Sequence, residues 1–415
     1  MTDAGPRGGA GGGPAAARPF VMLGLIAVVE LLGMAGWFAG GVAARDLGVR
    51  WQLSAVEAAW LTSIVQLGFV AGTLVAAVLN LPDLLPSRWY VAGAALAAAG
   101  VNGSILVVDG YPAALATRFF LGFCLAGVYP PAMKMAATWF RDRRGFAIGA
   151  VVGALTVGKA SPYLVEALGG LGLEAVIGST AAAALTASLL VAVAYRDGPY
   201  GFPRRPFSWR LVGEVARVPA LRLVTAGYLG HMWELYAFWG FVAAYWAASL
   251  EAAGSPGSPA LVAGLAFVSI AVGVVGCLWG GQAADRLGRE RVVIWSLAAS
   301  GTAAVLSTAV FGGPLALTLV VILVWGVAVI ADSAQYSALV TEVAPPHAVG
   351  TALTLQTSLG FLLTMVAIQF VAAAGGPATR WAFPALALGP VAGILAMSAL
   401  VRARRVRLEP GGPTG

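Results

Sequence analysis

The chain is poor in charge, in histidine and in cysteine. Only 10% of its 415 residues are charged, and it has 2 histidines and 2 cysteines. This leaves no cluster of histidine and cysteine from which a metal site could be built. Cys124 and Cys277 both fall in apolar stretches, so no disulfide in a loop is expected. These scarcities favour a protein without a bound metal.

Signatures of enzymes are also missing. The sequence has no phosphate-binding loop, no zinc-ligand spacing and no nucleophile elbow. The polar segments between apolar runs are too short to form a catalytic domain. We therefore expect neither an enzyme nor a cofactor.

Apolar residues are abundant instead. They make up 59% of the chain, whose mean hydropathy is +0.85, whereas soluble domains are roughly 45–50% apolar. They gather in runs that match the roughly 20 residues a helix needs to cross about 30 Å of hydrocarbon. The sequence thus predicts an all-α membrane protein embedded in a lipid bilayer.

Twelve such runs predict twelve transmembrane helices. They lie at residues 20–44, 53–80, 88–108, 111–140, 145–168, 172–195, 219–249, 259–284, 291–311, 315–343, 349–373 and 379–403. Residues 1–19 are rich in glycine, alanine and proline and have no apolar core. We expect them to be a disordered cytoplasmic tail and not a cleaved signal peptide, so the first span itself directs insertion.

The basic residues predict the orientation. With both termini in the cytoplasm, 18 of the 25 basic residues fall in cytoplasmic segments, three (Arg45, Arg50 and Arg380) fall in external loops, and four lie in or at the edge of spans. This bias follows the positive-inside rule for an inner-membrane, multi-pass protein. It also accounts for the net charge of +7 without a nucleic-acid partner.

The two halves of the chain repeat each other weakly. Segments that begin at Gly122 and Gly326 both open with glycine, pass through a polar turn and reach a second glycine, Gly145 or Gly350, at an offset of 204 or 205 residues. The repeat predicts six-helix bundles at 20–195 and 219–403, a cytoplasmic linker at 196–218 and a cytoplasmic tail at 404–415. This plan is typical of secondary transporters, which bind a small molecule between their halves. We expect a monomer.

A loop motif points to a family. The segment GGQAADRLGRER, residues 280–291, resembles the signature loop of the major facilitator superfamily, which gates the carrier. Glycine in this loop permits the close approach of two helices, and aspartate can accept hydrogen bonds from the N-terminus of a neighbouring helix. The first-half loop keeps Asp83 and Arg88, and RFFLGFCLAG resembles the superfamily's Arg-x-x-x-Gly helix. The loop residues on the pattern are Gly281, Asp285, Arg286, Gly288, Arg289 and Arg291.

The resemblance implies the fold of that superfamily and transport by alternating access. The stretches HMWELYAFW and ADSAQYSALV resemble a bacterial branch grouped with nitrate, cyanate and small organic-acid porters. Glycine-rich nitrate signatures are missing, so nitrate is not assigned. The fifth span carries Lys159 after Gly158 and delays its proline to Pro162, which departs from the Gly-Pro pair of drug antiporters.

Ionisable residues inside the spans are the candidate functional groups, because a charge at mid-bilayer costs about 2.5–3.5 kcal/mol. The resemblance implies that spans 1, 4, 7 and 10 line the central cavity. Glu30 in span 1 and Arg118 in span 4 resemble the coupling pair of proton-linked relatives. The alternative is an ion pair that only holds two helices together.

His231 and Glu234 lie three residues apart and share one face of span 7. Because histidine can exchange a proton in the physiological pH range, the pair is a candidate protonation switch or substrate ligand. Alternatively, Glu234 is only hydrogen-bonded near the surface of the cavity, and His231 packs on Trp233 or Tyr236.

Lysine is kept at only two positions, whereas 23 of the 25 basic residues are arginine. Lysine is a compact charge that can lose its proton when buried. Lys159 is too deep in its span to reach the surface, so we expect it to bind an anionic substrate. Lys134 lies closer to the end of its span and can extend toward the surface.

Span 10 supplies the opposite wall. ADSAQYSALV places Asp332, Gln335 and Tyr336 on one side of a helix, as a polar cavity wall or, through Ser333 and Ser337, as a helix-helix contact. The function that we expect is symport of protons with a small organic anion. Arg118 and Lys159 would hold the anion, and Glu30 or the His231/Glu234 pair would carry the proton.

The alternative is a proton-coupled exporter of amphipathic or cationic compounds. In that carrier Glu30, Glu234 and Asp332 would attract the cation.

Overall fold

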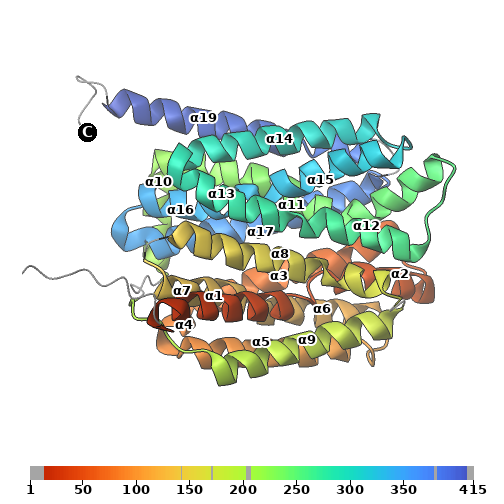
Figure 1. Ribbon diagram of the computed structural model, residues 1–415, viewed down its shortest axis with the longest axis horizontal. Coiled ribbons are helices and arrows are strands. Elements are labelled where there is room, and N and C mark those ends of the chain that lie inside the picture. The colour runs from red at the N-terminus through yellow and green to blue at the C-terminus, as the bar shows by residue number, and fades with distance from the viewer. Residues whose placement is uncertain (1–13, 142, 170–171, 202–206, 378–380, 409–415) are drawn as a thin grey trace, which may run out of the picture.

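The computed structural model describes residues 14–141, 143–169, 172–201, 207–377 and 381–408, and all regular structure in these ranges is helical. Most helices run side by side along the longest axis of the molecule (Figure 1). Nine of the helices described are long and apolar enough to cross a membrane. Arg7, Arg204, Arg205 and Arg380, which entered the charge count, lie outside the described ranges.

Helices occupy all twelve predicted spans. Seven spans are single helices: α3 (Ala55–Val78), α5 (Ser87–Ser104), α8 (Arg144–Ala167), α9 (Leu173–Ala194), α11 (Pro219–Ala252), α14 (Arg289–Ala309) and α17 (Val349–Ala373).

The other five spans are interrupted and consist of two helices each. They are α1 (Pro14–Gly33) with α2 (Ala39–Trp51), α6 (Tyr111–Leu125) with α7 (Tyr129–Trp139), α12 (Pro259–Ala271) with α13 (Gly273–Leu287), α15 (Leu315–Ala331) with α16 (Ser333–Val343), and α18 (Ala382–Ala385) with α19 (Leu388–Leu408). The short elements are α4 (Leu81–Leu84), α10 (Trp209–Arg217) and η1 (Pro346–Ala348).

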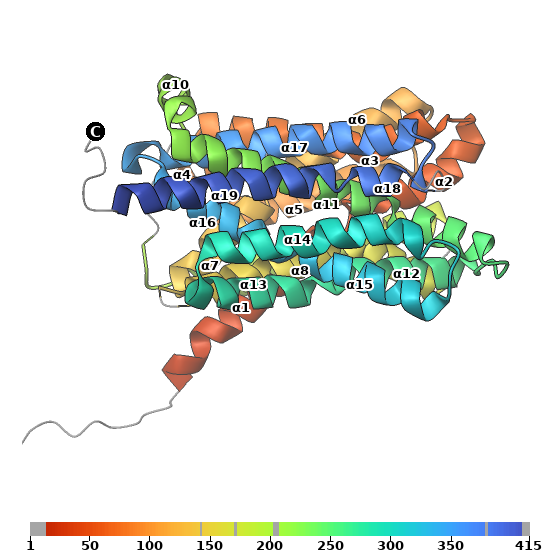
Figure 2. The ribbon, with the colours of Figure 1, turned by 90° about the horizontal axis from the view of Figure 1, so that it is seen from above.

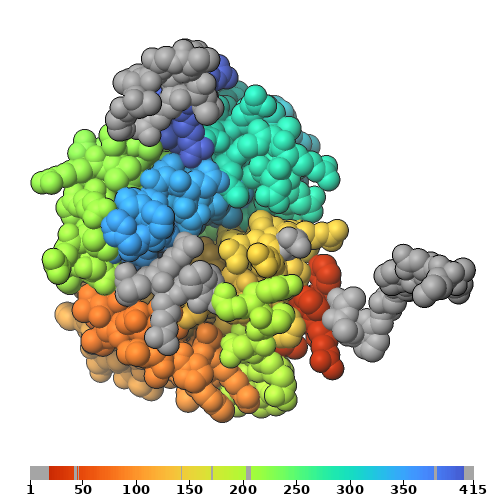
Figure 3. Space-filling model, turned by 90° about the vertical axis from the view of Figure 1, so that its left-hand side faces the viewer, coloured from red at the N-terminus to blue at the C-terminus, as the bar shows by residue number. Residues whose placement is uncertain are grey.

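The helices form two groups, α1–α9 below and α11–α19 above in Figure 1. The start of α1 and the end of α19 lie at one end of the molecule, which we call the termini end, and the start of α1 projects from the bundle there (Figure 2). Seen from this end, the first half fills most of the lower part of the surface and the second half most of the upper part (Figure 3).

Close glycine contacts repeat in the two halves. A Cβ at Gly122 would lie 2.0 Å from the carbonyl oxygen of Val65, and a Cβ at Gly326 would lie 2.0 Å from that of Ser269. Each pair of equivalent positions is 204 residues apart. The glycine that opens each copy of the repeat is therefore needed where span 4 crosses span 2 and where span 10 crosses span 8, because no side chain fits there.

The halves meet along two seams. Helix α3 packs against α17, and α8 packs against α12 and α13. The first seam joins spans 2 and 11, and the second joins spans 5 and 8. In the repeat, span 2 corresponds to span 8 and span 11 corresponds to span 5, so the repeat relates one seam to the other. This pattern is what a two-fold relation between the halves requires.

The first span is not the continuous helix predicted for residues 20–44. It breaks after Gly33 and resumes at Ala39. Glycine weakens a helix by about 1 kcal/mol per residue relative to alanine, and Gly33, Gly36 and Gly40 surround the break. An open backbone inside a membrane is stable only where other groups satisfy its carbonyls, and a buried arginine does so here.

Candidate functional site

Lys159 stands at the centre of the molecule. Its side chain is buried, and Nζ donates a hydrogen bond to the Tyr236 hydroxyl. The ammonium nitrogen lies 3.7 Å from the centre of the Trp37 ring and 4.5 Å from that of Tyr236. Trp239 and Phe361 complete the surround at 5.8 and 6.0 Å. Aromatic faces attract a cation, so these rings offset part of the cost of burying it.

Glu30 is a buried acid on α1, beside the point where α8 contacts that helix. Its side chain is fully buried, and neither carboxylate oxygen has a hydrogen-bond partner among the described residues. Gly158, the residue before Lys159, brings the two helices together, because a Cβ there would lie 2.2 Å from the carbonyl oxygen of Leu31. Helix α8 thus touches the backbone of α1 one residue away from both charged groups.

Arg118 does not pair with Glu30, contrary to the pairing expected from the sequence. Its guanidinium donates to three main-chain carbonyls, those of Leu61 at 3.1 Å, Gly36 at 3.0 Å and Trp37 at 2.5 Å. Two of these belong to the break between α1 and α2. Since Nε, Nη1 and Nη2 each have a carbonyl partner, Arg118 holds the broken span in place.

His231 contacts a different acid from the one expected. Nδ1 lies 2.9 Å from Asp332 Oδ1, and both side chains are buried. Asp332 is the residue at which span 10 is interrupted. The rings of Tyr228 and Tyr336 flank the imidazole at 6.0 and 5.6 Å between centroids. Among the described residues, His231 Nε2 has no hydrogen-bond partner.

Glu234 is held by other groups. It accepts hydrogen bonds from Ser300 Oγ at 2.8 Å and Trp325 Nε1 at 2.7 Å. These partners lie on α14 and α15, so the carboxylate points into the second half and not toward the histidine one turn away. Hydrogen-bond donors on both oxygens suit a structural anchor.

Gln335 does not line a cavity wall with Asp332. It donates to the carbonyl of Gly280 at 3.3 Å and accepts from Arg289 Nη1 at 3.0 Å. Gln335 on α16 therefore binds two residues of the signature loop. Tyr336 is buried against the histidine cluster.

The signature loop behaves as its motif predicts at two positions. A Cβ at Gly281 would lie 2.8 Å from the carbonyl oxygen of Gly145, which confirms the close approach of α13 to α8. A Cβ at Gly145 would lie 3.2 Å from Asp285 Oδ2. The carboxylate thus stands at the N-terminus of α8, where the helix dipole stabilises negative charge.

The loops of the two halves carry ion pairs of opposite polarity. Lys134 Nζ lies 2.7 Å from Asp83 Oδ1 in the first half, and Arg289 Nε lies 2.7 Å from Glu342 Oε1 in the second. In one half the loop supplies the acid, and in the other it supplies the base. Lys134 therefore has a partner at the termini end, in agreement with its shallow position.

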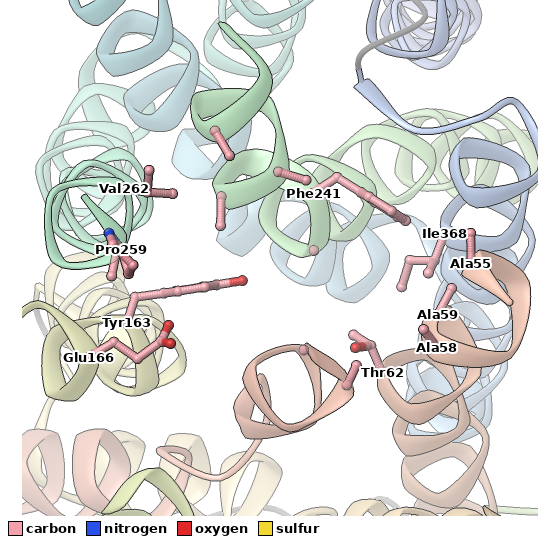
Figure 4. Close-up of a pocket in the computed structure, with 17 residues that line it drawn as sticks. Ala55, Ala58, Ala59, Thr62, Tyr163, Glu166, Phe241, Pro259, Val262 and Ile368 are labelled. Carbon is pink, nitrogen blue, oxygen red and sulfur yellow. The ribbon is translucent and has the colours of Figure 1, made fainter. Parts of the chain in front are cut away.

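Two cavities lie on either side of Lys159. One, of about 390 Å³, lies away from the termini end and is lined largely by alanine and glycine, with Tyr163, Glu166 and Thr62 as polar groups (Figure 4). The other, of about 150 Å³, is lined by Tyr236, Trp239 and Phe361 among others. Along α8, Leu155 faces the smaller cavity and Tyr163 the larger, so Lys159 and its aromatic rings lie between them.

The aromatic surround of Lys159 was not anticipated, because tryptophans in membrane proteins mostly pack or anchor at interfaces. Its rings come from the break in span 1, from α11 and from α17, which are far apart in the sequence. A signal did exist in the segment GMAGWFAGG, where glycines on both sides of Trp37 mark a break that turns this ring inward.

A molecule of two helical halves with charged side chains buried between them is a membrane carrier. The chain belongs to the major facilitator superfamily, whose model matches residues 23–368. No curated protein sequence matches it significantly.

Solved structures share the fold at low identity. A bacterial homologue of the human lysosomal transporter Spinster, in an inward-facing, unoccupied conformation, has a TM-score of 0.66 at 14% identity, over 93% of this chain and 97% of that one. A mutant of the nucleoside transporter NupG has a TM-score of 0.69 at 15% identity, over 92% of this chain and 99% of that one. This membership makes the protein a secondary transporter that works by alternating access.

Proposed function

We propose that the protein moves a small organic anion together with a proton, and that Lys159 binds the carboxylate of the substrate. The observation that carries this proposal is the couple of buried residues Lys159 and Glu30, which flank the contact between α8 and α1, with both carboxylate oxygens lacking a hydrogen-bond partner among the described residues. An ammonium ion in an apolar bundle needs an anionic partner. Glu30 provides one when the carrier is empty, and a substrate carboxylate provides one when it is loaded.

The couple gives a simple exchange of partners. A proton that binds Glu30 neutralises it and leaves Lys159 for the substrate carboxylate. When the substrate leaves, Glu30 releases the proton and resumes its place beside the lysine. Both the empty and the loaded carrier then have a neutral site, and neither must take an unpaired charge across the membrane.

The second cluster, His231 with Asp332, is a candidate for an additional protonation site in this cycle. It is buried, and its imidazole has one nitrogen toward the acid and one without a partner among the described residues. Glu234 and Arg118 have smaller roles in the proposal, because their hydrogen bonds to protein groups hold them in place.

We further propose that the termini end faces the cytoplasm in the inner membrane and that the protein acts as a monomer. The positive-inside bias of the sequence supports this orientation. The larger cavity would then face the outside.

The alternative function remains a proton-coupled exporter of cationic or amphipathic compounds. The observation that favours it is the ring of Trp37, Tyr236, Trp239 and Phe361, which would hold a cationic substrate as well as it holds the lysine. Glu30 would then be the partner of the substrate.

The proposal is tested with Glu30→Gln in proteoliposomes. Glutamine mimics the protonated acid, so we expect the variant to exchange labelled substrate across the membrane but to lose proton-driven accumulation. Glu57→Gln is the matched control, because Glu57 is exposed at the start of α3 and caps that helix with Ser54. Accumulation by Glu30→Gln against a gradient would show that Glu30 is not the coupling group.

A further inference from the structure

The charged side chains around Lys159 limit the number of carboxylates that a bound substrate can have. Lys159 is the one cationic side chain among the described residues that stands between the two cavities. Arg118 is buried nearby, and its guanidinium donates hydrogen bonds to the carbonyls of Gly36, Trp37 and Leu61. Among the described residues that line the smaller cavity none is cationic, so a second substrate carboxylate in that cavity would be buried without a partner.

The smaller cavity sets the body of the substrate. Three of the rings around the lysine, Tyr236, Trp239 and Phe361, also line this cavity, so a carboxylate on Nζ would place its substituent there. The volume of about 150 Å³ equals that of a cavity able to hold benzene. A body about the size of a six-membered ring therefore fits.

The chemistry of the lining excludes charge from that body. Among the described residues that line the smaller cavity, none carries a formal charge. Apolar side chains such as Leu155 and Ile330 alternate with hydroxyl groups, among them Thr73, Tyr129 and Ser333. Such a lining suits an uncharged ring and accepts a hydroxyl substituent on it.

We infer that the substrate is a monocarboxylate with an uncharged, ring-sized body, bound through one carboxylate on Lys159 with the body in the cavity lined by Tyr236, Trp239 and Phe361. This inference rests on the proposed function. It adds the number of charges and the size and polarity of the substrate.

The test compares five probes of nearly equal size on the purified full-length protein: benzoate, 4-hydroxybenzoate, phthalate, benzamide and benzylammonium. Labelled benzoate measures binding, and the others compete for it or are followed by their own thermal stabilisation of the protein. We expect the two monocarboxylates to bind and the other three to bind at least about tenfold more weakly, since a hydrogen bond to a charged group contributes roughly 1.5–3 kcal/mol.

Lysine chemistry adds a variant test, because the chain has only two lysines. Lys159→Ala should weaken benzoate binding about ten- to hundredfold, whereas Lys134→Ala should leave it unchanged, as Lys134 pairs with Asp83 near the termini end. An amine-reactive reagent offers a measurement without any variant. Benzoate should slow the labelling of Lys159 and not that of Lys134.

The outcomes separate this inference from the function on which it rests. Equal or tighter binding of phthalate would overturn the single-carboxylate inference and leave organic-anion transport standing. Equal binding of benzamide would overturn it as well, because the site would then not distinguish a carboxylate from an uncharged amide. Binding of benzylammonium without binding of any carboxylate would overturn both and favour the exporter.

Discussion

At the scale of single residues, two buried basic side chains of the first half, Arg118 and Lys159, have different surroundings. Arg118 and Lys159 are both fully buried, yet the arginine donates to carbonyls and the lysine faces rings and an acid. The difference follows from their shapes. A planar guanidinium can satisfy several carbonyls at once, whereas an ammonium is a compact charge on a flexible stem.

The structural role of Arg118 leads to a prediction for Arg118→Lys. The three N–H groups of lysine radiate from one nitrogen and do not reproduce the spread of Nε, Nη1 and Nη2 toward Leu61, Gly36 and Trp37, and each carbonyl left without its donor costs about 1–3 kcal/mol. We expect a lower melting temperature and a lower folded yield, with substrate affinity of the folded fraction changed far less than in Lys159→Ala. Thermal unfolding and ligand binding on the same preparation check this.

The control is Arg118→Lys compared with Arg88→Lys, since Arg88 makes one side-chain hydrogen bond, to the carbonyl of Ala192. If Arg118→Lys has normal thermal stability but does not bind substrate, Arg118 is a substrate-binding residue and not a structural one.

At the scale of elements, glycine decides which helices touch. Gly122 and Gly326 set equivalent crossings in the two halves, and Gly281 sets the contact of the signature loop with α8. Gly158 has the same effect between α8 and α1, and the charged residues Lys159 and Glu30 flank this contact. In the fifth span, Gly158 thus allows α8 to approach α1 closely, and the next residue, Lys159, places a charge beside that contact.

The substitution Gly158→Ala tests this arrangement. The new Cβ would lie 2.2 Å from the carbonyl of Leu31, so α8 must move away from α1. Overpacking of this kind costs about 1–3 kcal/mol. We expect a lower melting temperature and weaker proton-driven accumulation, because the lysine and the acid are moved apart.

Gly178→Ala is the matched control, since a Cβ at Gly178 on α9 would meet no atom within 4 Å. It should be neutral or slightly stabilising. Normal coupled transport by Gly158→Ala would mean that the spacing of Lys159 and Glu30 does not matter.

At the scale of the whole molecule, both ion pairs of the loops lie at the termini end, and the larger cavity lies at the other. The pairs Asp83–Lys134 and Arg289–Glu342 hold equivalent places with reversed charge. The halves therefore differ at this surface in the polarity of this one ion pair.

The orientation of the molecule leads to the last prediction. In a background with Cys124 and Cys277 replaced by alanine, a single cysteine is introduced by Arg289→Cys or by Val107→Cys. Arg289 begins α14 at the termini end, and Val107 is an exposed residue after α5 at the other end. In intact cells, a membrane-impermeant thiol reagent should label the Val107→Cys protein and spare the Arg289→Cys protein. The reverse pattern would invert the topology.

The sequence by itself determined the class, the approximate places of the spans, the repeat and the family, but not the breaks inside five spans. What it determined follows from apolar run length, from glycine spacing and from a loop motif, all of which act between residues close in the chain. It also identified Glu30, Lys159, His231 and Asp332 as buried groups that require a partner.

Only the tertiary structure decided who the partners are. Arg118 donates to main-chain carbonyls and not to Glu30, and His231 contacts Asp332 and not Glu234. The positions of a helix along the chain say which residues share a face, but not how that face is turned toward its neighbours. That rotation is set by glycine contacts and by the break in span 1, through atoms more than a hundred residues apart.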